Sequence, residues 1–404
     1  MILTLEHIPE SLKRIVVRAD LNVPMQDGTV RDATRIVSVL PTLRELLDHG
    51  KTVYLISHLG RPKGIWDLRF SLAPVAEVLK TLLPTYSVIF DPRDVTQVAA
   101  SALKTHPEGS LILLENVRFY PGEETNCMDF GQKLAEVGQA YVNDAFASCH
   151  RAHTSTCALA RLLPSFAGRL LQRELEALET TVENTVRPTC AVVGGSKVST
   201  KIDLLKNLMN KVDHLCIGGA MANTFLFALG KPVGRSLYEP DLAPLAREII
   251  SMAANRGCTI HLPVDAVVAG ALEAGVEVNT VSCNDVEPED LILDIGPLTC
   301  QAWDSVFDFC KTVIWNGPVG AFEVTPFAGG SLFVARTLAQ RTRQGQLSTI
   351  AGGGDTLSVL NVAGVMGDFT FVSTAGGAFL EWLEGKPLPG LQALKHHNLD
   401  LAHA

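Results

Sequence analysis

The sequence predicts an α/β protein of two domains, each built on a parallel sheet that helices cover on both faces. Short apolar segments alternate along the chain with amphipathic stretches of helical period, which is typical of parallel sheets. At 404 residues the chain is longer than one hydrophobic core usually supports, so we expect two domains. Hydrophobic residues make up 47% of the chain and aromatic residues 6%, which fits strands of Val, Ile and Leu.

The composition excludes several classes of protein. A net charge of −9 argues against a general nucleic-acid binder. No apolar run approaches the ~18 residues that a membrane helix needs, and the first residues lack the apolar core of a secretion signal. The nine cysteines are odd in number, scattered, and without a C-x-x-C pair, so we expect reduced core thiols in a cytoplasmic protein.

In the first half, apolar strands end in loops that carry basic or polar groups. We expect strands at 13–18, 52–57, 110–114 and 140–143, and a helix at 35–49. Ligands on parallel sheets bind beyond the carboxyl ends of the strands. The basic residues at those ends should therefore converge on one small polyanion. They are Arg35, His58, Arg61, Arg118, His150 and Arg151.

Each of these residues also has a simpler interpretation. A single arginine near a strand end is often solvated or engaged in a structural ion pair. Asp20 and Asn22 could bind hydroxyl groups, or could cap the turn before Pro24. His106 and His153 are assigned no role, because the sequence supplies neither with a partner.

Residues 168–187 are predicted to form one long interdomain helix. Leu171, Leu175, Leu178 and Val182 fall on a single stripe, and Pro188 would end the helix. A flexible linker is the competing interpretation, and the apolar stripe argues against it.

The segment 190–205 suggests a phosphate-binding site. A buried strand at 190–193 precedes Gly194 and Gly195, and we expect a helix to begin there with Lys197 and Lys201 on one face. Glycines let backbone N–H groups approach an anion, and a helix N-terminus adds its dipole. The P-loop pattern is absent. The alternative is a surface helix with two solvated lysines.

Glycines recur at the strand ends of the second half. They follow apolar segments near Gly218, Gly317, Gly352 and Gly376, and repeated close backbone approach suits a nucleotide lying across a second sheet. Asp355 could bind a phosphate-bound Mg²⁺, or could be a helix N-cap. Glu323 could bind ribose hydroxyls, or could be an exposed loop acid.

Taken together, these loops resemble phosphoglycerate kinase along nearly the whole chain. The motifs that carry the resemblance are VRADLNVP, SHLGRP, LENVRF, NDAFASCHRAH, VVGGSKVSTKIDLL, IGGAMANTF, GRSLYE, ILDIGP, VIWNGPVGAFE, IAGGGDT and VSTAGGAFLEWLEGKPLPG. The resemblance implies two Rossmann-like domains with a cleft between them. The N-terminal domain would span 1–169, with 389–404 packing back onto it, and the C-terminal domain 170–388. It implies a reversible, in-line transfer of the acyl phosphate of 1,3-bisphosphoglycerate to MgADP by a monomer.

The resemblance also implies a role for each loop. The phosphoglycerate site would comprise Asp20, Leu21, Asn22, Arg35, His58, Leu59, Gly60, Arg61, Arg118, His150 and Arg151. The nucleotide site would comprise Gly195, Lys201, Gly218, Gly219, Asn316, Pro318, Glu323, Gly352, Gly353, Gly354, Asp355 and Thr356, with Asp355 toward Mg²⁺. The phosphoryl group would be stabilised during its transfer by Arg35, by Lys197 and by the helix N-termini at Gly354 and Gly377.

The chemistry implied needs no general base. The acceptor is a carboxylate with a pKa of about 4, which is already ionised at neutral pH. Two alternatives stay open: a kinase for another carboxylic acid, and an inactive relative, although Arg35, Lys197, Lys201 and Asp355 are all present. The chain departs from the family pattern where alanine replaces a common glycine, at Ala147, Ala220 and Ala375.

Overall fold

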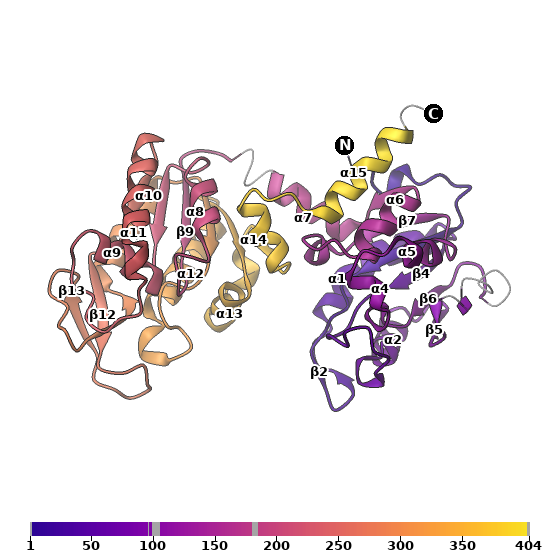
Figure 1. Cartoon of the computed structure of the whole chain (residues 1–404), viewed down its shortest axis with the longest axis horizontal. Helices are drawn as coiled ribbons and strands as arrows, with labels where there is room; N and C mark the ends of the chain where they lie inside the picture. Colours follow the sequence, from indigo (N-terminus) through magenta and orange to yellow (C-terminus); the bar gives the residue numbers. More distant parts are fainter. Residues whose placement is uncertain (1, 96, 99–105, 180–184, 402–404) are drawn as a thin grey trace. The chain divides into compact units, whose positions relative to one another are not determined.

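The computed structural model describes residues 2–95, 97–98, 106–179 and 185–401, which form two compact units (Figure 1). Unit 1 contains the described residues up to Glu176 together with those from Pro387 onward. Unit 2 runs from Ala177 to Lys386. Each unit has its own parallel sheet flanked by helices, so the predicted fold class is confirmed.

Unit 1 is organised around a sheet of six parallel strands. In spatial order these are β5 (Val88–Asp91), β6 (Leu111–Leu114), β4 (Thr52–Ile56), β1 (Arg14–Ala19), β7 (Ala140–Asp144) and β8 (Ser165–Ala167). The central strands are buried on both faces, as their unbroken apolar runs predict. A short antiparallel ribbon, β2 (Met25–Gln26) and β3 (Thr29–Val30), precedes the first long helix.

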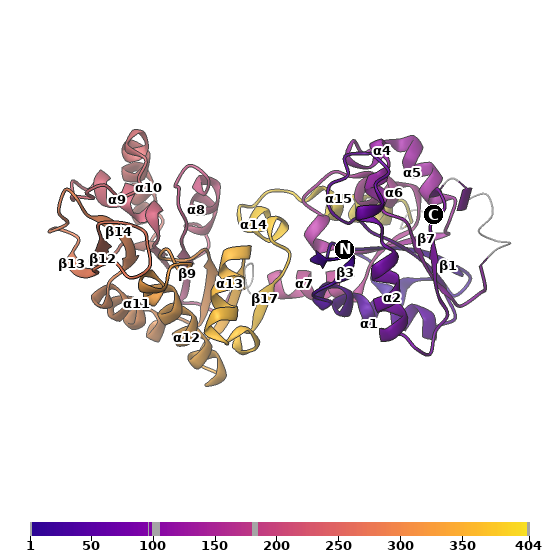
Figure 2. The ribbon, with the colours of Figure 1, turned by 90° about the horizontal axis from the view of Figure 1, so that it is seen from below.

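Two groups of helices cover the unit 1 sheet (Figure 2). On one face, α1 (Thr34–Asp48) and α2 (Ala73–Leu82) pack on a core that includes Ile15, Val17 and Leu55. A second group packs around the π-helical turn η5 (Thr154–Ala158). It contains α4 (Pro121–Glu124), α5 (Met128–Ala135), α6 (Leu159–Leu162) and α15 (Pro389–Leu401).

Unit 2 has a second sheet of six parallel strands. Their spatial order is β11 (Thr259–His261), β10 (His214–Ile217), β9 (Thr189–Val193), β15 (Thr312–Asn316), β16 (Ser348–Gly352) and β17 (Phe371–Ser373). The remaining strands form an antiparallel sheet that the sequence analysis did not predict: β13 (Asn279–Ser282), β12 (Asp265–Ala269) and β14 (Leu291–Ile295).

Helices lie on both faces of the main sheet of unit 2 (Figure 2). One face carries α8 (Ile202–Leu208), α9 (Ala220–Ala228) and α10 (Ala243–Asn255). The other carries α11 (Pro297–Phe309), α12 (Gly329–Arg343) and α13 (Gly354–Ala363), which share a core with Trp315. The last helix of the unit, α14 (Gly377–Leu383), packs against α8.

The single long helix predicted for 168–187 is wrong. The structure has α7 (Arg169–Leu178), whose Leu171, Leu175 and Leu178 are buried as the stripe predicts. Val182 lies outside the described residues. Residues 185–187 are irregular, so the helix does not extend to Pro188. The N-terminus of α7 is held by Asp144, which accepts hydrogen bonds from the backbone of Leu170 and Leu171.

The predicted helix at Lys197 is also wrong. Residues 196–201 form bends and turns, and α8 begins only at Ile202 with Lys201 as its N-cap. The two lysines therefore do not share a helix face. Glycine and serine at positions 194–196 favour turns, which delays the start of the helix.

Two further findings concern the whole chain. None of the described helices has both the length and the hydropathy required to cross a lipid bilayer. All nine cysteines are free thiols, and all except Cys127 are buried.

Candidate functional site

Loops from neighbouring strands of unit 1 meet at the carboxyl end of its sheet. Arg35, in the first turn of α1, forms an ion pair with Asp20 after β1. Nδ1 of His58, after β4, lies 3.9 Å from the carboxylate of Asp20. The backbone N–H of Gly60 donates to Oδ1 of Asn22 at 2.9 Å. Since β1 and β4 are adjacent in the sheet, the two predicted loops form one surface.

The alternative interpretation of Asp20 holds at the same time. The backbone N–H of Asn22 donates to Oδ1 of Asp20 at 3.1 Å, which is the hydrogen bond of an Asx turn. Leu21 and Leu59 are buried in the hydrophobic core. Their side chains thus anchor the two loops to the core.

Arg118 comes from the short helix η3 (Val117–Phe119), which follows β6. It is buried, donates from Nη1 to the carbonyl of Gly60 at 2.7 Å, and pairs through Nε with Glu124 at 3.3 Å. Burial is the main cause that lowers the pKa of the Arg118 guanidinium, and Arg18 and Arg151 lower it further.

Arg18, in β1, is a member of this site that the sequence analysis missed. Its side chain is buried, and Nη2 lies 3.0 Å from Nδ1 of His58 and 3.4 Å from Oγ of Ser148. A charged residue inside an otherwise apolar strand was the signal that could have revealed it, because a buried charge needs a polar neighbourhood.

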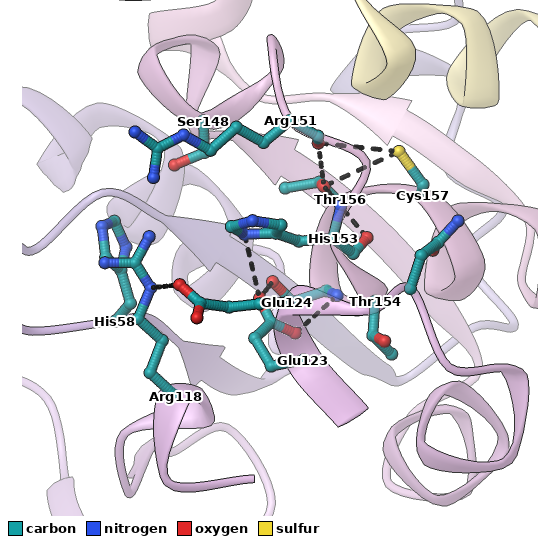
Figure 3. Close-up of polar contacts among 12 residues, drawn as sticks. His58, Arg118, Glu123, Glu124, Ser148, Arg151, His153, Thr154, Thr156 and Cys157 are labelled. Atoms are coloured by element: carbon teal, nitrogen blue, oxygen red, sulfur yellow. Dashed lines mark hydrogen bonds and ion pairs between the residues drawn. The ribbon is translucent and has the colours of Figure 1, made fainter. Parts of the chain in front are cut away.

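His153 was also missed, and the statement that it has no partner is wrong. Nδ1 of His153 lies 3.9 Å from Oε1 of the buried Glu123 (Figure 3). Burial lowers the pKa of His153 to about 4, and nearby Arg118, Arg18 and Arg151 act in the same direction. We define the basic cluster as Arg18, Arg35, His58, Arg118, His150, Arg151 and His153.

The other three basic residues of the predicted phosphoglycerate site are His150, Arg151 and Arg61. Nε of Arg151 lies 3.0 Å from Nε2 of His150. Arg61 is exposed, and within the described part of the chain its side chain has no hydrogen bond or ion pair. His106 does have a partner, contrary to the sequence analysis. Its Nε2 lies 3.0 Å from Asp91 in a buried pair, which we interpret as structural.

Unit 2 contains a pocket of about 370 Å³ at the carboxyl ends of its strands. Five of the predicted nucleotide residues line it: Gly195, Gly219, Pro318, Glu323 and Asp355. The apolar wall opposite was not predicted, and it comes largely from β14 and from Leu237 and Leu272. Nucleotide and cofactor pockets are typically apolar with a few fixed polar groups, and this pocket has that composition.

Lys201 and Asn316 form a polar support beside the pocket glycines. Nζ of Lys201 donates to Oδ1 of Asn316, and Nδ2 of Asn316 donates to the carbonyl of Gly352 at 2.7 Å. Burial lowers the pKa of Lys201 to about 8, although Asp355 and Glu384 favour its charged form. Thr356 is buried and accepts a hydrogen bond from the backbone of Gly317 at 2.8 Å.

The glycines of unit 2 allow backbone segments to approach closely. A Cβ at Gly194 would lie 1.9 Å from the carbonyl oxygen of Pro318. Gly219 has φ +67°, and its Cβ would lie 2.7 Å from the carbonyl oxygen of Gly195. Side chains cannot replace glycine at these two positions without moving the loops that line the pocket.

The two helices predicted to begin at Gly354 and Gly377 do begin there. The N-cap of α13 is Gly353 and that of α14 is Gly376. Asp355 is therefore not an N-cap, and its exposed carboxylate makes no hydrogen bond with the described residues. Lys197 and Glu323 are exposed in turns.

Comparison with known proteins identifies the family. The family model described as phosphoglycerate kinase matches residues 5–386. The chain belongs to the phosphoglycerate kinase family. The phosphoglycerate kinase of Sphingopyxis alaskensis is 53% identical over 383 residues, covering 95% of this chain and 96% of that protein. The phosphoglycerate kinase of Xanthobacter autotrophicus is 54% identical over 392 residues, covering 97% and 98%.

Solved structures give the same family. The structure of phosphoglycerate kinase from Coxiella burnetii has a TM-score of 0.90 and 40% identity, and covers 98% of this chain and 99% of that chain. The enzyme is therefore a phosphotransferase with a carboxyl group as acceptor. Its departures from the family pattern, Ala147, Ala220 and Ala375, all lack a positive φ, so their methyl groups cause no backbone strain.

Proposed function

We propose that this phosphoglycerate kinase binds phosphoglycerate at the basic cluster of unit 1 and ADP or ATP in the pocket of unit 2. The reaction is the reversible transfer of the acyl phosphate of 1,3-bisphosphoglycerate to ADP, which gives 3-phosphoglycerate and ATP. The observation that carries the site assignment is the basic cluster itself. Four arginines and three histidines gather there, and among the described residues the ion pairs of this cluster are with Asp20, Glu123 and Glu124. So many N–H donors in one place favour the oxygens of a small polyanion.

Binding at the two sites would use different forces. At the basic cluster, the planar guanidinium groups pair with carboxylate and phosphate oxygens. In the pocket, the apolar wall of β14 would contact the base, Glu323 would accept hydrogen bonds from ribose hydroxyls, and Lys201 would pair with phosphate. The backbone at Gly353, Gly354 and Thr356 would lie along the phosphates.

In this scheme, catalysis depends on positioning the two substrates and on neutralising the charge of the phosphoryl group, and it uses no general base. The carboxylate of 3-phosphoglycerate is already ionised at neutral pH. Arg35 would approach the moving phosphoryl group from unit 1, and Lys197 from unit 2. The N-termini of α13 at Gly354 and α14 at Gly377 would donate backbone N–H groups. Because the two substrates are held by different units, transfer requires both units to close around them and exclude water.

Asp355 has the chemistry required to hold Mg²⁺ with the nucleotide. Its carboxylate is exposed at the rim of the pocket and is not used for helix capping. Mg²⁺ usually takes one or two carboxylates together with substrate phosphates and water. When bound, the ion would neutralise phosphate charge. Lys201 and Asp355 would then fix the orientation of the nucleotide phosphates.

We also propose a cytoplasmic monomer that binds no nucleic acid. Buried free thiols suit a reducing compartment, and the net charge of −9 opposes association with nucleic acid.

A coupled assay tests the proposal. ATP-dependent consumption of 3-phosphoglycerate should be saturable and should stop when Mg²⁺ is chelated. A kinase for another carboxylic acid would turn over its own substrate, with 3-phosphoglycerate acting at most as a weak competitor.

A further inference from the structure

A carboxylate that the proposed mechanism does not use lies beneath the basic cluster. Glu123, in α4, has no solvent exposure. Ser155 donates to both of its oxygens, from N at 2.9 Å and from Oγ at 2.6 Å. Both of these hydrogen bonds favour the ionised carboxylate, which can only accept. A buried carboxylate is costly unless it is paired, so its position calls for a cationic partner.

The nearest link from Glu123 to a cation passes through Ser155. The hydroxyl of Ser155 gives its only proton to Glu123 and accepts a hydrogen bond from Nε of Arg18 at 2.9 Å. Arg18 is itself buried and has no ion pair with a carboxylate in the described part of the chain. Burial raises the pKa of Glu123, and among the influences that oppose burial the positive charge of Arg18 is the largest. The two charges are therefore coupled across one hydroxyl group.

The Nη2 end of the Arg18 guanidinium determines the protonation state of His58. Nη2 of Arg18 lies 3.0 Å from Nδ1 of His58. A guanidinium nitrogen can only donate, so Nδ1 must be the unprotonated acceptor. His58 is then neutral, with its proton on Nε2. Burial and the surrounding cations hold the pKa of His58 well below its usual range, which agrees with this geometry.

We propose that Glu123 is a positioning residue for phosphoglycerate binding: through Ser155 it orients Arg18, and Arg18 keeps His58 in the neutral form protonated on Nε2. This inference rests on the proposed function of the basic cluster. A fixed Nε2–H is a directional donor to an anionic oxygen, and the neutral ring adds no further repulsion among the crowded arginines. The guanidinium also donates to the carbonyl of Ala19 and to Ser148, but its Nε bond to Ser155 is the only one of its hydrogen bonds among the described residues that leads to a carboxylate.

The first test measures the tautomer directly, without substrate. Long-range ¹H–¹⁵N correlation spectra at pH 7, assigned with a His58→Gln sample, should show His58 of the wild type as a single Nε2–H tautomer. Glu123→Gln keeps the size of the side chain and removes the charge, and it should give a mixture of tautomers. Glu136→Gln, which removes an exposed charge in the same unit, should match the wild type. The same single tautomer in Glu123→Gln would overturn the inference.

The second test separates positioning from stability. Glu123→Gln and Ser155→Ala should each raise KM for 3-phosphoglycerate about tenfold, with kcat and KM for ATP within about twofold of the wild type. Simple loss of folded enzyme would lower kcat and leave both KM values unchanged, and that result would contradict positioning. If Glu123→Gln does not fold, Ser155→Ala carries both tests, since it removes the link and keeps the carboxylate.

The two proposals can fail separately. A wild-type enzyme whose rate does not depend on 3-phosphoglycerate would overturn the proposed function. The tautomer of His58 would still decide whether Glu123 acts through Ser155 and Arg18.

Discussion

Lys201 donates a hydrogen bond to Asn316, a residue 115 positions later in the chain. The amide of Asn316 also donates to the carbonyl of Gly352, so one side chain ties the N-terminus of α8 to the ends of β15 and β16. This relationship holds a lysine in a largely buried position beside the pocket. The consequence is a cation whose charge depends on pH near neutrality.

We predict that nucleotide affinity falls above pH ~8. Burial lowers the pKa of Lys201 to about 8, so the free enzyme loses this positive charge as the pH rises through that value. Calorimetric titration of MgADP from pH 6.5 to 9.5 would measure the effect. Lys201→Arg keeps its charge throughout this range and should show a flatter profile. An equally steep decline in Lys201→Arg would contradict the assignment.

Arg35→Ala should lower kcat by roughly 10³ while phosphoglycerate still binds, because the other arginines of the basic cluster remain. Arg31→Ala is the matched control, since it removes an exposed arginine just before the same helix. Steady-state kinetics and direct binding of 3-phosphoglycerate would distinguish the two variants. Near-normal turnover in Arg35→Ala would remove Arg35 from the mechanism.

Lys197→Ala should give a comparable loss of kcat with the nucleotide still bound. The side chain is exposed in the turn before α8 and is not used to hold that turn together, so its removal should leave the melting temperature unchanged. Lys311→Ala, an exposed lysine of the same unit, should keep full activity. A large fall in melting temperature in Lys197→Ala would point to a structural role.

Gly194→Ala should destabilise the enzyme by about 3 kcal/mol and weaken nucleotide binding. The added Cβ would lie 1.9 Å from the carbonyl oxygen of Pro318, and backbone atoms cannot move aside as a flexible side chain can. Gly367→Ala is the control, because a Cβ there meets nothing within 4 Å. Denaturant titration of both variants would measure the difference, and equal stability would refute the close approach.

His153 should make the ligand-free enzyme less stable in acid. Its pKa is lowered from 6.5 to about 4, mainly by burial, so the unfolded chain takes up the proton at a higher pH than the folded one. The stability that this group contributes is complete above pH 6.5 and is lost as the pH falls toward 4.

Because Asp144 has a pKa raised to about 7, it changes stability in the opposite direction over part of this range. We therefore predict how the pH dependence of the free energy of unfolding differs between variants. Between pH 6.5 and 4, the free energy of unfolding of His153→Gln should decline less than that of the wild type. His49→Gln, an exposed histidine, should follow the wild type. Parallel curves for His153→Gln and the wild type would contradict the burial of a neutral histidine.

The sequence alone predicted the parallel sheets, most strand positions, the family, and the loops that carry Arg35, His58 and Lys201. These features are local, because the apolar period, the glycines and the motifs can each be read from neighbouring residues of the sequence. The start of α8 and the end of α7 were mispredicted, because turn and helix preferences nearly balance there and packing decides between them.

Only the tertiary structure decided how the buried charges pair. Arg18 and Glu123 are far apart in the chain, and nothing near either residue shows that one serine hydroxyl joins them. The apolar wall of β14 and the place of His153 were decided in the same way. Burial fixes the protonation of a side chain and the partner it needs, and burial depends on segments that meet only when the chain folds.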